Sequence, residues 1–169
     1  MKKHLILLIT IFYHFSTYAQ EEEASAAFDF WVGKWTLTWD EGNGSIGKAT
    51  NNIVKILDDK VIQENFEILE GAQKGFKGTS ISVYNPKTKQ WHQAWADNQG
   101  SYFDFTGAIE GDKKIFKTRM IEKEGKKIIR RMVFYNIQKE RMTWDWEGSE
   151  DGGKSWKLLW RINYKKVNE

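Results

Sequence analysis

Apolar and polar residues alternate along most of this chain with a period of two, which is typical of half-buried β-strands. In residues 33–40, Trp35, Leu37 and Trp39 alternate with lysine and threonine, and residues 155–165 repeat the pattern with tryptophan, leucine, isoleucine and tyrosine. Short turn signals such as EGNG, YNPKTK, DNQG and EDGGK separate the alternating segments. The pattern therefore predicts ten strands, near residues 33–40, 45–56, 61–69, 75–84, 89–97, 101–109, 113–122, 126–136, 140–148 and 155–165.

The order of these segments predicts an all-β fold. Consecutive strands joined by short turns form an antiparallel up-and-down meander, and a long meander removes its exposed edges by closing into a barrel. A short helical turn is expected only around residues 24–31. We expect the FDFW segment, residues 28–31, to plug one end of a single ten-stranded barrel, while Trp35, Leu37 and Trp39 point inward.

The start of the chain has the composition of an export signal. Lys2 and Lys3 precede an apolar run, and small residues follow it up to residue 19. The run is shorter than the roughly 20 residues of a membrane span, although an uncleaved anchor is the alternative. We therefore expect a signal peptide at 1–19, a leader at 20–27 and a barrel domain at 28–166, exported to the periplasm or outside the cell.

Charge and composition exclude several classes of function. Removal of residues 1–19 takes two of the 26 basic residues and none of the 23 acidic ones, which leaves the charges nearly balanced. Clustered positive charge marks nucleic-acid partners, so none is expected, and no second apolar run predicts a membrane span. The chain has no cysteine, and His92 is the one histidine after residue 19. We therefore expect no disulfide, no metal and no cofactor, and the sequence predicts no oligomeric state.

Three longer motifs carry a family resemblance. FDFWVGKW, GTSISVYNPKTKQWHQAWADNQGSY and WEGSEDGGKSWKLLWRINYKK resemble a bacterial domain of unknown function, the 1579-type, whose members begin with Phe-x-Phe-Trp-x-Gly-x-Trp. The resemblance covers residues 28–166 and implies a barrel like the lipocalins and fatty-acid-binding proteins, with an internal cavity. It extends more distantly to the nitrobindins, which hold haem through a histidine near the chain end. The last predicted strand here has no histidine, so tyrosine ligation is the one haem alternative.

The segment SEDGGKSW, residues 149–156, matches the Asp box of sialidase propellers. A propeller would need the motif in many blades, and it occurs once here. We interpret it as a hairpin turn in which Asp151 accepts backbone N–H bonds and Trp156 packs beneath.

Charged residues at inward positions are the first candidates for chemistry. Glu64 shares its strand face with isoleucine and phenylalanine, so its carboxylate needs a partner. The family resemblance implies that Arg131, rather than Arg130, points inward, on the same face as Val133 and Tyr135. Arg131 would then pair with Glu64 in a structural ion pair or hold an anionic ligand.

The predicted strand at 89–97 allows two orientations. Trp91, Gln93, Trp95 and Asp97 share one face and His92 lies on the other. The face with the two tryptophans is the more apolar, so we expect it to point into the barrel and His92 to lie at the surface. A one-residue bulge would reverse the faces and make His92 the natural general acid or base of the cavity.

Tryptophan is abundant, with nine in the chain. Trp144 and Trp146 share a strand face, and we expect them to meet Trp156 and Trp160 across the last hairpin. Core packing explains such residues as well as ligand contact does. The residues expected to bind a ligand are Trp35, Trp39, Gln93, Trp95, Asp97, Tyr135, Trp144 and Trp160.

Two main functions compete at this stage. In the first, the barrel binds a small polar or amphipathic ligand, such as an acidic sugar, in an aromatic cavity. In the second, the same cavity is a cofactor-free lyase, dehydratase or isomerase site for a uronate-type oligosaccharide, with Glu64, His92 and Arg131 as catalytic candidates. A third possibility, a structural envelope protein, predicts paired internal charges and a filled cavity.

Overall fold

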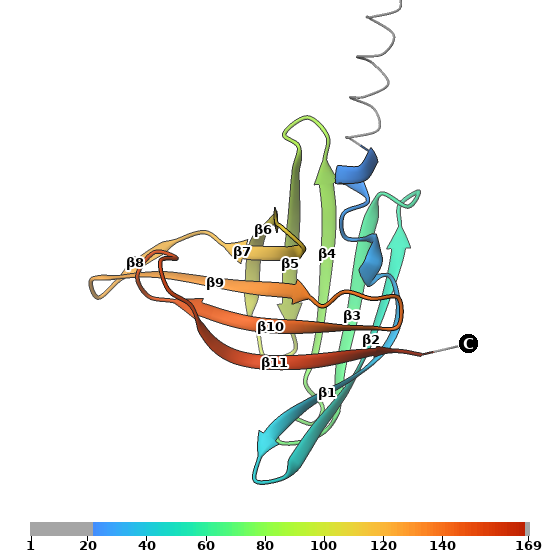
Figure 1. Cartoon of the computed structure of the whole chain (residues 1–169), viewed down its shortest axis with the longest axis vertical. Helices are drawn as coiled ribbons and strands as arrows, with labels where there is room; N and C mark the ends of the chain where they lie inside the picture. Colours follow the sequence, from blue (N-terminus) through green and yellow to red (C-terminus); the bar gives the residue numbers. More distant parts are fainter. Residues whose placement is uncertain (1–21, 168–169) are drawn as a thin grey trace, which may run out of the picture.

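The computed structural model describes residues 22–167, which form one closed barrel (Figure 1). A short 3-10 helix, η1 (Asp29–Trp31), precedes the strands. The strands are β1 (Gly33–Gly42), β2 (Ser45–Ile56), β3 (Val61–Glu70), β4 (Lys77–Asn85), β5 (Gln90–Asp97), β6 (Tyr102–Glu110), β7 (Lys113–Thr118), β8 (Ile121–Lys123), β9 (Lys126–Tyr135), β10 (Arg141–Ser149) and β11 (Lys157–Lys166).

Every strand pairs with its sequence neighbours in antiparallel fashion, except that β7 pairs with β9 and not with β8. The sheet order runs from β10 and β11 through β1 to β7 and then β9, and β10 also pairs with β9, which closes the ring. The predicted ten-stranded up-and-down barrel is confirmed. The bounds of its strands follow the turn signals to within two residues, with one exception between β7 and β8.

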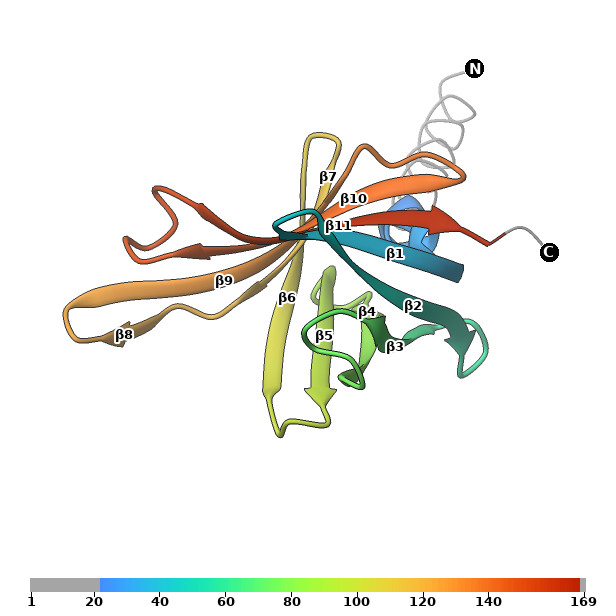
Figure 2. The ribbon, with the colours of Figure 1, turned by 90° about the horizontal axis from the view of Figure 1, so that it is seen from below.

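The predicted strand at 113–122 is divided in two. Residues 131–134 of β9 pair with β7, whereas residues 126–128 pair with β8, so β8 leaves the barrel wall. In Figure 2 the β8–β9 hairpin and the β10–β11 hairpin extend together away from the barrel. A parallel bridge between Lys127 and Asp151 joins these two hairpins. We call the extension, residues 119–129 and 149–157, the wing.

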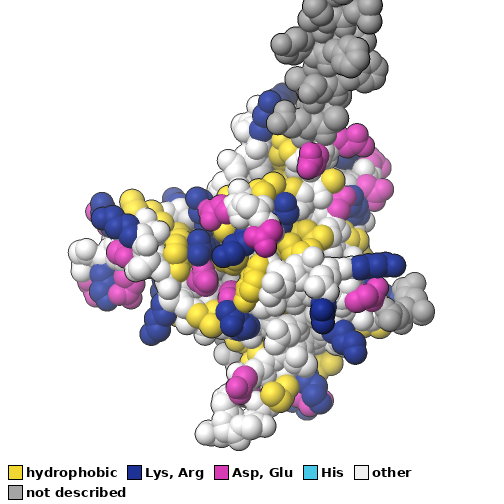
Figure 3. Space-filling view, viewed as in Figure 1, with side chains coloured by type: hydrophobic (Ala, Val, Ile, Leu, Met, Phe, Trp, Pro, Cys, Tyr) yellow, Lys and Arg dark blue, Asp and Glu magenta, His cyan; other side chains and the backbone are white. Residues whose placement is uncertain are grey.

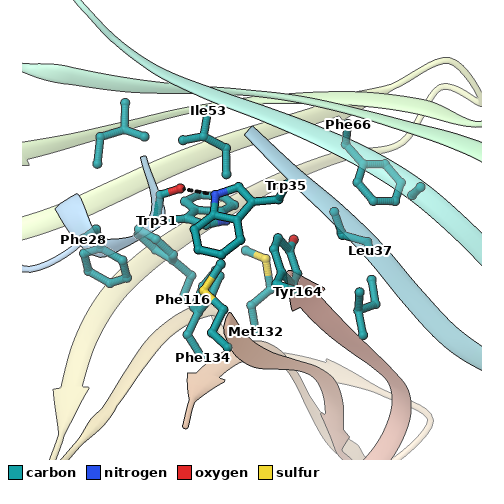
Figure 4. Packing of buried hydrophobic residues seen from close by; sticks show 14 of the residues in the cluster. Phe28, Trp31, Trp35, Leu37, Ile53, Phe66, Phe116, Met132, Phe134 and Tyr164 are labelled. Carbon is teal, nitrogen blue, oxygen red and sulfur yellow. Dashed lines mark hydrogen bonds between the residues drawn. The ribbon is translucent and has the colours of Figure 1, made fainter. Parts of the chain in front are cut away.

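The FDFW segment closes one end of the barrel, as predicted. Phe28 is fully buried and stacks on Phe116 with ring centroids 4.3 Å apart (Figure 4). It also meets Trp91 edge-on at 5.1 Å. Trp31 is also buried and packs edge-on against Phe134. Burial of each such ring contributes about 1.5–3 kcal/mol relative to exposure. We call this packed region, built on η1 and the start of β1, the closed end.

The chain before η1 lies against the closed end. Residues 22–25 form one helical turn, and the indole N–H of Trp91 donates to the Ala24 carbonyl at 2.9 Å. The predicted signal peptide, residues 1–19, lies outside the described residues. Within residues 22–167 no helix has the length and apolar character that crossing a membrane requires. On the face seen in Figure 3, positive and negative side chains are intermixed.

Candidate functional site

A cavity lies at the end of the barrel that η1 does not plug. Phe28 packs on Trp91 at the start of β5, whereas the cavity takes Trp95 and Asp97 from the end of the same strand. Its volume is ≈ 170 Å³. A dry protein cavity of about 150 Å³ holds a benzene molecule, so the space fits one ring with a short substituent. It is lined by Glu64, Phe66, Phe76, Trp95, Asp97, Phe103, Phe105, Met132, Trp144, Trp146, Trp160, Ile162 and Tyr164.

Aromatic rings form the walls of this cavity. Trp144 and Trp146 point to the same side because they are two residues apart on β10, and their rings are parallel within 4° at 6.4 Å. Trp160 of β11 stands edge-on to Trp144 at 5.8 Å, and Trp95 stacks with Phe76 at 6.5 Å. All five side chains are half-buried, so their faces are partly open to solvent. We call this region the open end.

A buried carboxyl group forms the floor. Glu64 is 5% exposed. Its Oε1 accepts a hydrogen bond from Asn51 Nδ2 at 2.7 Å, and its Oε2 accepts one from the Ser80 hydroxyl at 2.7 Å. Asn51 Nδ2 also donates to the Tyr164 hydroxyl at 3.2 Å. Glu64 therefore has neutral partners, and the expected ion pair with Arg131 does not form.

This environment changes the acidity of Glu64. Burial raises the pKa of Glu64 from 4.5 to about 7, against the opposing effect of its hydrogen bonds from Ser80 and Asn51. Burial, together with the nearby Glu64 charge, also raises the pKa of Tyr164 well above its ordinary value, so this phenol stays neutral. The floor thus offers a carboxyl group that changes protonation near neutral pH.

A second row of polar side chains supports the floor from behind. Gln93 is 1% exposed, and its Nε2 donates to Ser82 Oγ at 2.9 Å and to Ser80 Oγ at 3.2 Å. Gln93 thus fixes the serine that holds Glu64. Gln93 does not itself line the cavity, so its predicted role as a ligand contact becomes a positioning role. Two buried acceptors, Asn51 Oδ1 and Gln93 Oε1, have no hydrogen-bond donor among the described residues.

Asp97 lies at the mouth and is held by its own turn. Its Oδ1 accepts the backbone N–H groups of Gln99 and Ser101, both at 3.0 Å, and its Oδ2 accepts the Trp95 indole N–H at 3.2 Å. Desolvation opposes ionisation, but these hydrogen bonds outweigh it and hold the pKa of Asp97 below its usual value. Asp97 is therefore a carboxylate at neutral pH, and it also orients Trp95.

Trp95 lies flat against the wall because of a glycine. A Cβ atom at Gly78 of β4 would overlap the Trp95 ring, and a Cβ atom at Gly47 of β2 would overlap Trp39 in the same way. Glycine at both positions lets the ring lie directly against the backbone.

The structure separates the other predicted aromatic contacts into core and wall. Trp35 is 1% exposed and donates its indole N–H to the Trp31 carbonyl at 2.8 Å, deep in the core (Figure 4). Trp39 packs edge-on against Trp160 at 5.1 Å. It is buried behind the cavity wall and supports Trp160 without lining the cavity itself. Trp95, Asp97, Trp144 and Trp160 line the cavity as predicted.

His92 lies on the outer surface of β5, which pairs in regular register with both neighbours. The interpretation with the tryptophan face inside is therefore confirmed. The bulge that would turn His92 inward is not present in this strand, so His92 is remote from Glu64 and the cavity.

Arg131 and Tyr135 point outward, contrary to the prediction. Arg131 Nε lies 2.6 Å from Glu147 Oε2, and its guanidinium sits 3.8 Å over the Trp156 ring. The Tyr135 hydroxyl donates to Asp145 Oδ2 at 3.2 Å on the same outer face. Alternation places these residues outside because Met132 and Phe134 occupy the inward positions of β9; Met132 lines the cavity and Phe134 packs in the core.

The predicted position of Trp156 is also wrong. We expected it to meet Trp144 across the last hairpin, but it packs on Arg131 outside the barrel. Trp160 does meet Trp144 and lies opposite Trp146, with a register shift directly after that pair. The shift separates Trp156 from the inward face.

The Asp box is a turn, as interpreted. Asp151 Oδ1 accepts the backbone N–H groups of Lys154 and Ser155 at 2.9 and 3.0 Å, and the Ser155 hydroxyl donates to Asp151 Oδ2 at 2.6 Å. Gly152 and Gly153 take positive φ of 79° and 89°. The motif builds the tip of the wing and contributes nothing to the cavity.

Sequence reasoning missed several residues of the site. Asn51 and Ser80 hold the carboxyl group, and alternation in β2 and β4 was the available signal. In β4 the signal was inverted, because Ile81 and Val83 face solvent while the serines face inward. The cavity also takes Phe66, Phe76, Phe103, Phe105, Met132, Trp146, Ile162 and Tyr164, which were not among the predicted ligand contacts.

Within residues 22–167 no three histidine or acidic side chains are grouped so that they could hold a metal ion. Neither a protein-family model nor a curated protein matches this sequence, so the family resemblance stays a prediction that rests on the three motifs.

Proposed function

We propose that this protein is a binding barrel that holds a small amphipathic ligand in the cavity at the open end. One observation carries the proposal: half-buried tryptophan rings, together with phenylalanine rings, surround a ring-sized space with a single buried carboxyl group at its floor. Ligand sites in proteins combine apolar walls with a few polar groups that set orientation. The walls here supply burial, and Glu64 with Tyr164 supplies orientation.

The charges of the cavity constrain the ligand. The lining residues include Glu64 and Asp97 but no lysine, arginine or histidine. Arg131, which was expected to clamp a carboxylate, lies outside with Glu147. Binding of an acidic sugar would place its carboxylate near two carboxyl groups without a counter-ion. The proposed ligand is therefore neutral or positively charged, with one apolar ring.

Tryptophan fluorescence tests the proposal. The protein is titrated with small ring compounds, and binding is confirmed by calorimetry. Trp144→Ala should weaken binding about tenfold to a hundredfold, because a wall face is lost. The matched control is Trp156→Ala, which removes an indole from the wing and should leave affinity unchanged. Equal effects of the two substitutions would place the ligand elsewhere.

A second candidate function has its own supporting observation. A carboxyl group with a pKa raised to about 7 inside an aromatic cavity is suited to general acid–base catalysis. Of the three catalytic candidates, Glu64 alone lies in the cavity. Incubation of the protein with candidate ligands, followed by mass spectrometry of the free pool, distinguishes the two functions. A pool compound that loses water or rearranges with wild-type protein, but not with Glu64→Gln, would establish catalysis; an unchanged mass on the retained compound supports binding.

A further inference from the structure

We propose that the ligand is an organic cation, a single-ring amine whose ammonium group sits at the floor of the cavity against Glu64. The inference rests on the proposed function and narrows its ligand class. It stands on three features of the open end: the sign of its charges, the shortage of hydrogen-bond donors at its floor, and the indole faces of its walls.

The titratable groups that face the cavity are all acidic or neutral. Glu64 comes from β3, Asp97 from the end of β5 and Tyr164 from β11, and the remaining lining residues are apolar or aromatic. Ionised Glu64 in the buried floor and Asp97 at the more exposed mouth, without a cation among the lining residues, give the cavity a negative potential. Such a potential attracts a positively charged ligand and repels an anion.

The floor is short of hydrogen-bond donors. Each Glu64 oxygen receives one neutral donor, from Asn51 and from Ser80, and a carboxylate oxygen accepts two. Asn51 Oδ1 also has no donor among the described residues, but Asn51 does not line the cavity, so the acceptor capacity that faces a ligand is that of Glu64. An ammonium group brings up to three N–H donors and no acceptor, so it complements this floor better than a carbonyl or ether does.

The walls favour the same charge. Indole is the best ring for cation–π attraction, and four indoles line the cavity: Trp95, Trp144, Trp146 and Trp160. Trp144 and Trp160 stand nearly perpendicular, at 89°, so they present a face and an edge to one corner. The ring of the ligand can stack on one indole while its cationic arm passes another.

Protonation of Glu64 must then be linked to binding. The pKa of Glu64 without ligand is about 7, and a cation binds the ionised carboxylate. Below pH 7 binding therefore releases a proton, and affinity rises up to tenfold per pH unit. Above pH 7 the dependence disappears. Asp97 is already ionised throughout this range, and Tyr164 is neutral throughout it, so neither adds to the linkage.

The test compares 2-phenylethylamine with 2-phenylethanol, which share the ring and the chain. Calorimetry is run at pH 6 and pH 8, in two buffers of different ionisation enthalpy, to count released protons. The amine should bind at least tenfold more tightly than the alcohol at pH 8 and release about one proton at pH 6. Glu64→Gln should remove this preference and the proton release while the alcohol keeps its affinity. Glu147→Gln on the outer face is the matched control and should behave as the wild type.

The outcomes separate this inference from the proposed function. If the alcohol binds as tightly as the amine, and affinity does not change between pH 6 and pH 8, the cation inference is overturned while the binding barrel stands. If neither compound binds, both fail. The pH dependence of the wild-type protein provides a readout that does not rely on the folding of the Glu64→Gln variant.

Discussion

The two ends of this barrel are built from the same kind of residue and differ in what those residues touch. At the closed end, Phe28 and Trp31 fill the space among Trp91, Phe116 and Phe134, and ring meets ring with both faces covered. At the open end, Trp144 meets Trp146 and Trp160, Trp95 meets Phe66 and Phe76, and these half-buried tryptophans border a cavity of ≈ 170 Å³.

The difference shows that aromatic content alone does not identify a binding site. An indole whose faces are all covered contributes to stability, whereas an indole with an uncovered face has surface left for a ligand. The FDFW segment creates the asymmetry, because it plugs one end and has no counterpart at the other among the described strands. Stability and binding should therefore be separable by mutation.

The largest expected effect concerns the closed end. Phe28→Ala should reduce the free energy of unfolding by about 3–5 kcal/mol, because it leaves a cavity among rings that cannot collapse. Trp144→Ala at the open end should cost less, about 1 kcal/mol, since its ring is only half-buried. Denaturant unfolding followed by circular dichroism measures both. Equal losses would mean that the two ends are packed alike.

Glu64 lies between the two ends, and its titration gives the next effect. The folded pKa of about 7 is above the value of 4.5 for an ordinary glutamate, so its contribution to stability is full below pH 4.5 and is lost as pH rises through 7. As the pH rises from 4 to 8, the wild type should therefore lose about 3 kcal/mol of unfolding free energy that the Glu64→Gln variant keeps.

Denaturant unfolding of both proteins at several pH values checks this. Asp97→Asn is a control in which the pH dependence has the opposite sign. Because the pKa of Asp97 is lowered in the folded protein, its carboxylate stabilises the fold at neutral pH, and this stabilisation is lost as the pH falls. A constant stability difference between Glu64→Gln and wild type over this pH range would show that the carboxyl group is solvated.

The smallest effect compares two glycines. A Cβ at Gly107 would lie 2.5 Å from Cβ of Trp91, which is fixed to the backbone at the closed end. A Cβ at Gly78 would instead meet the far edge of the half-buried Trp95 ring. Gly107→Ala should cost about 1–3 kcal/mol by overpacking, and Gly78→Ala less than about 1 kcal/mol.

Thermal unfolding measures the loss of stability, and ligand titration gives a second readout. Gly78→Ala should weaken binding because Trp95 swings away from the wall, while Gly107→Ala should leave the affinity of the folded protein unchanged. If Gly107→Ala proved harmless and Gly78→Ala unfolded the protein, the open end would be the more tightly packed of the two ends, contrary to this comparison.

The sequence predicted the barrel well because strand period and turn chemistry are local. Turns such as the one at Asp151 fix the strand ends through bonds to neighbouring N–H groups, independently of the rest of the fold. The division between β7 and β8 was missed because it depends on which part of β9 each segment pairs with, which is a long-range property.

The site was predicted less well because face assignment assumes that apolar residues point inward. In β9 the family resemblance placed Arg131 inward, and apolarity could not correct it because both faces are apolar: Val133 is buried on the outer side, opposite Asp145 with its Arg161 partner. In β4 the inward residues are serines because they serve Glu64 and Gln93. Where a buried polar network lines the inner face of a strand, the inner residues are polar and the outer ones apolar, so hydrophobic alternation indicates the wrong face.

Closure of the ring between β1 and β11 constrains how the chain folds. The Thr36 hydroxyl donates to the Lys165 carbonyl at 3.2 Å across a sequence separation of 129 residues. Contacts of such separation carry a large loop-closure entropy and slow the search for the native state. Until β11 has left the ribosome, β1 and β10 each present an unpaired edge to other chains. The barrel wall is therefore exposed to aggregation until β11 has been synthesised and paired.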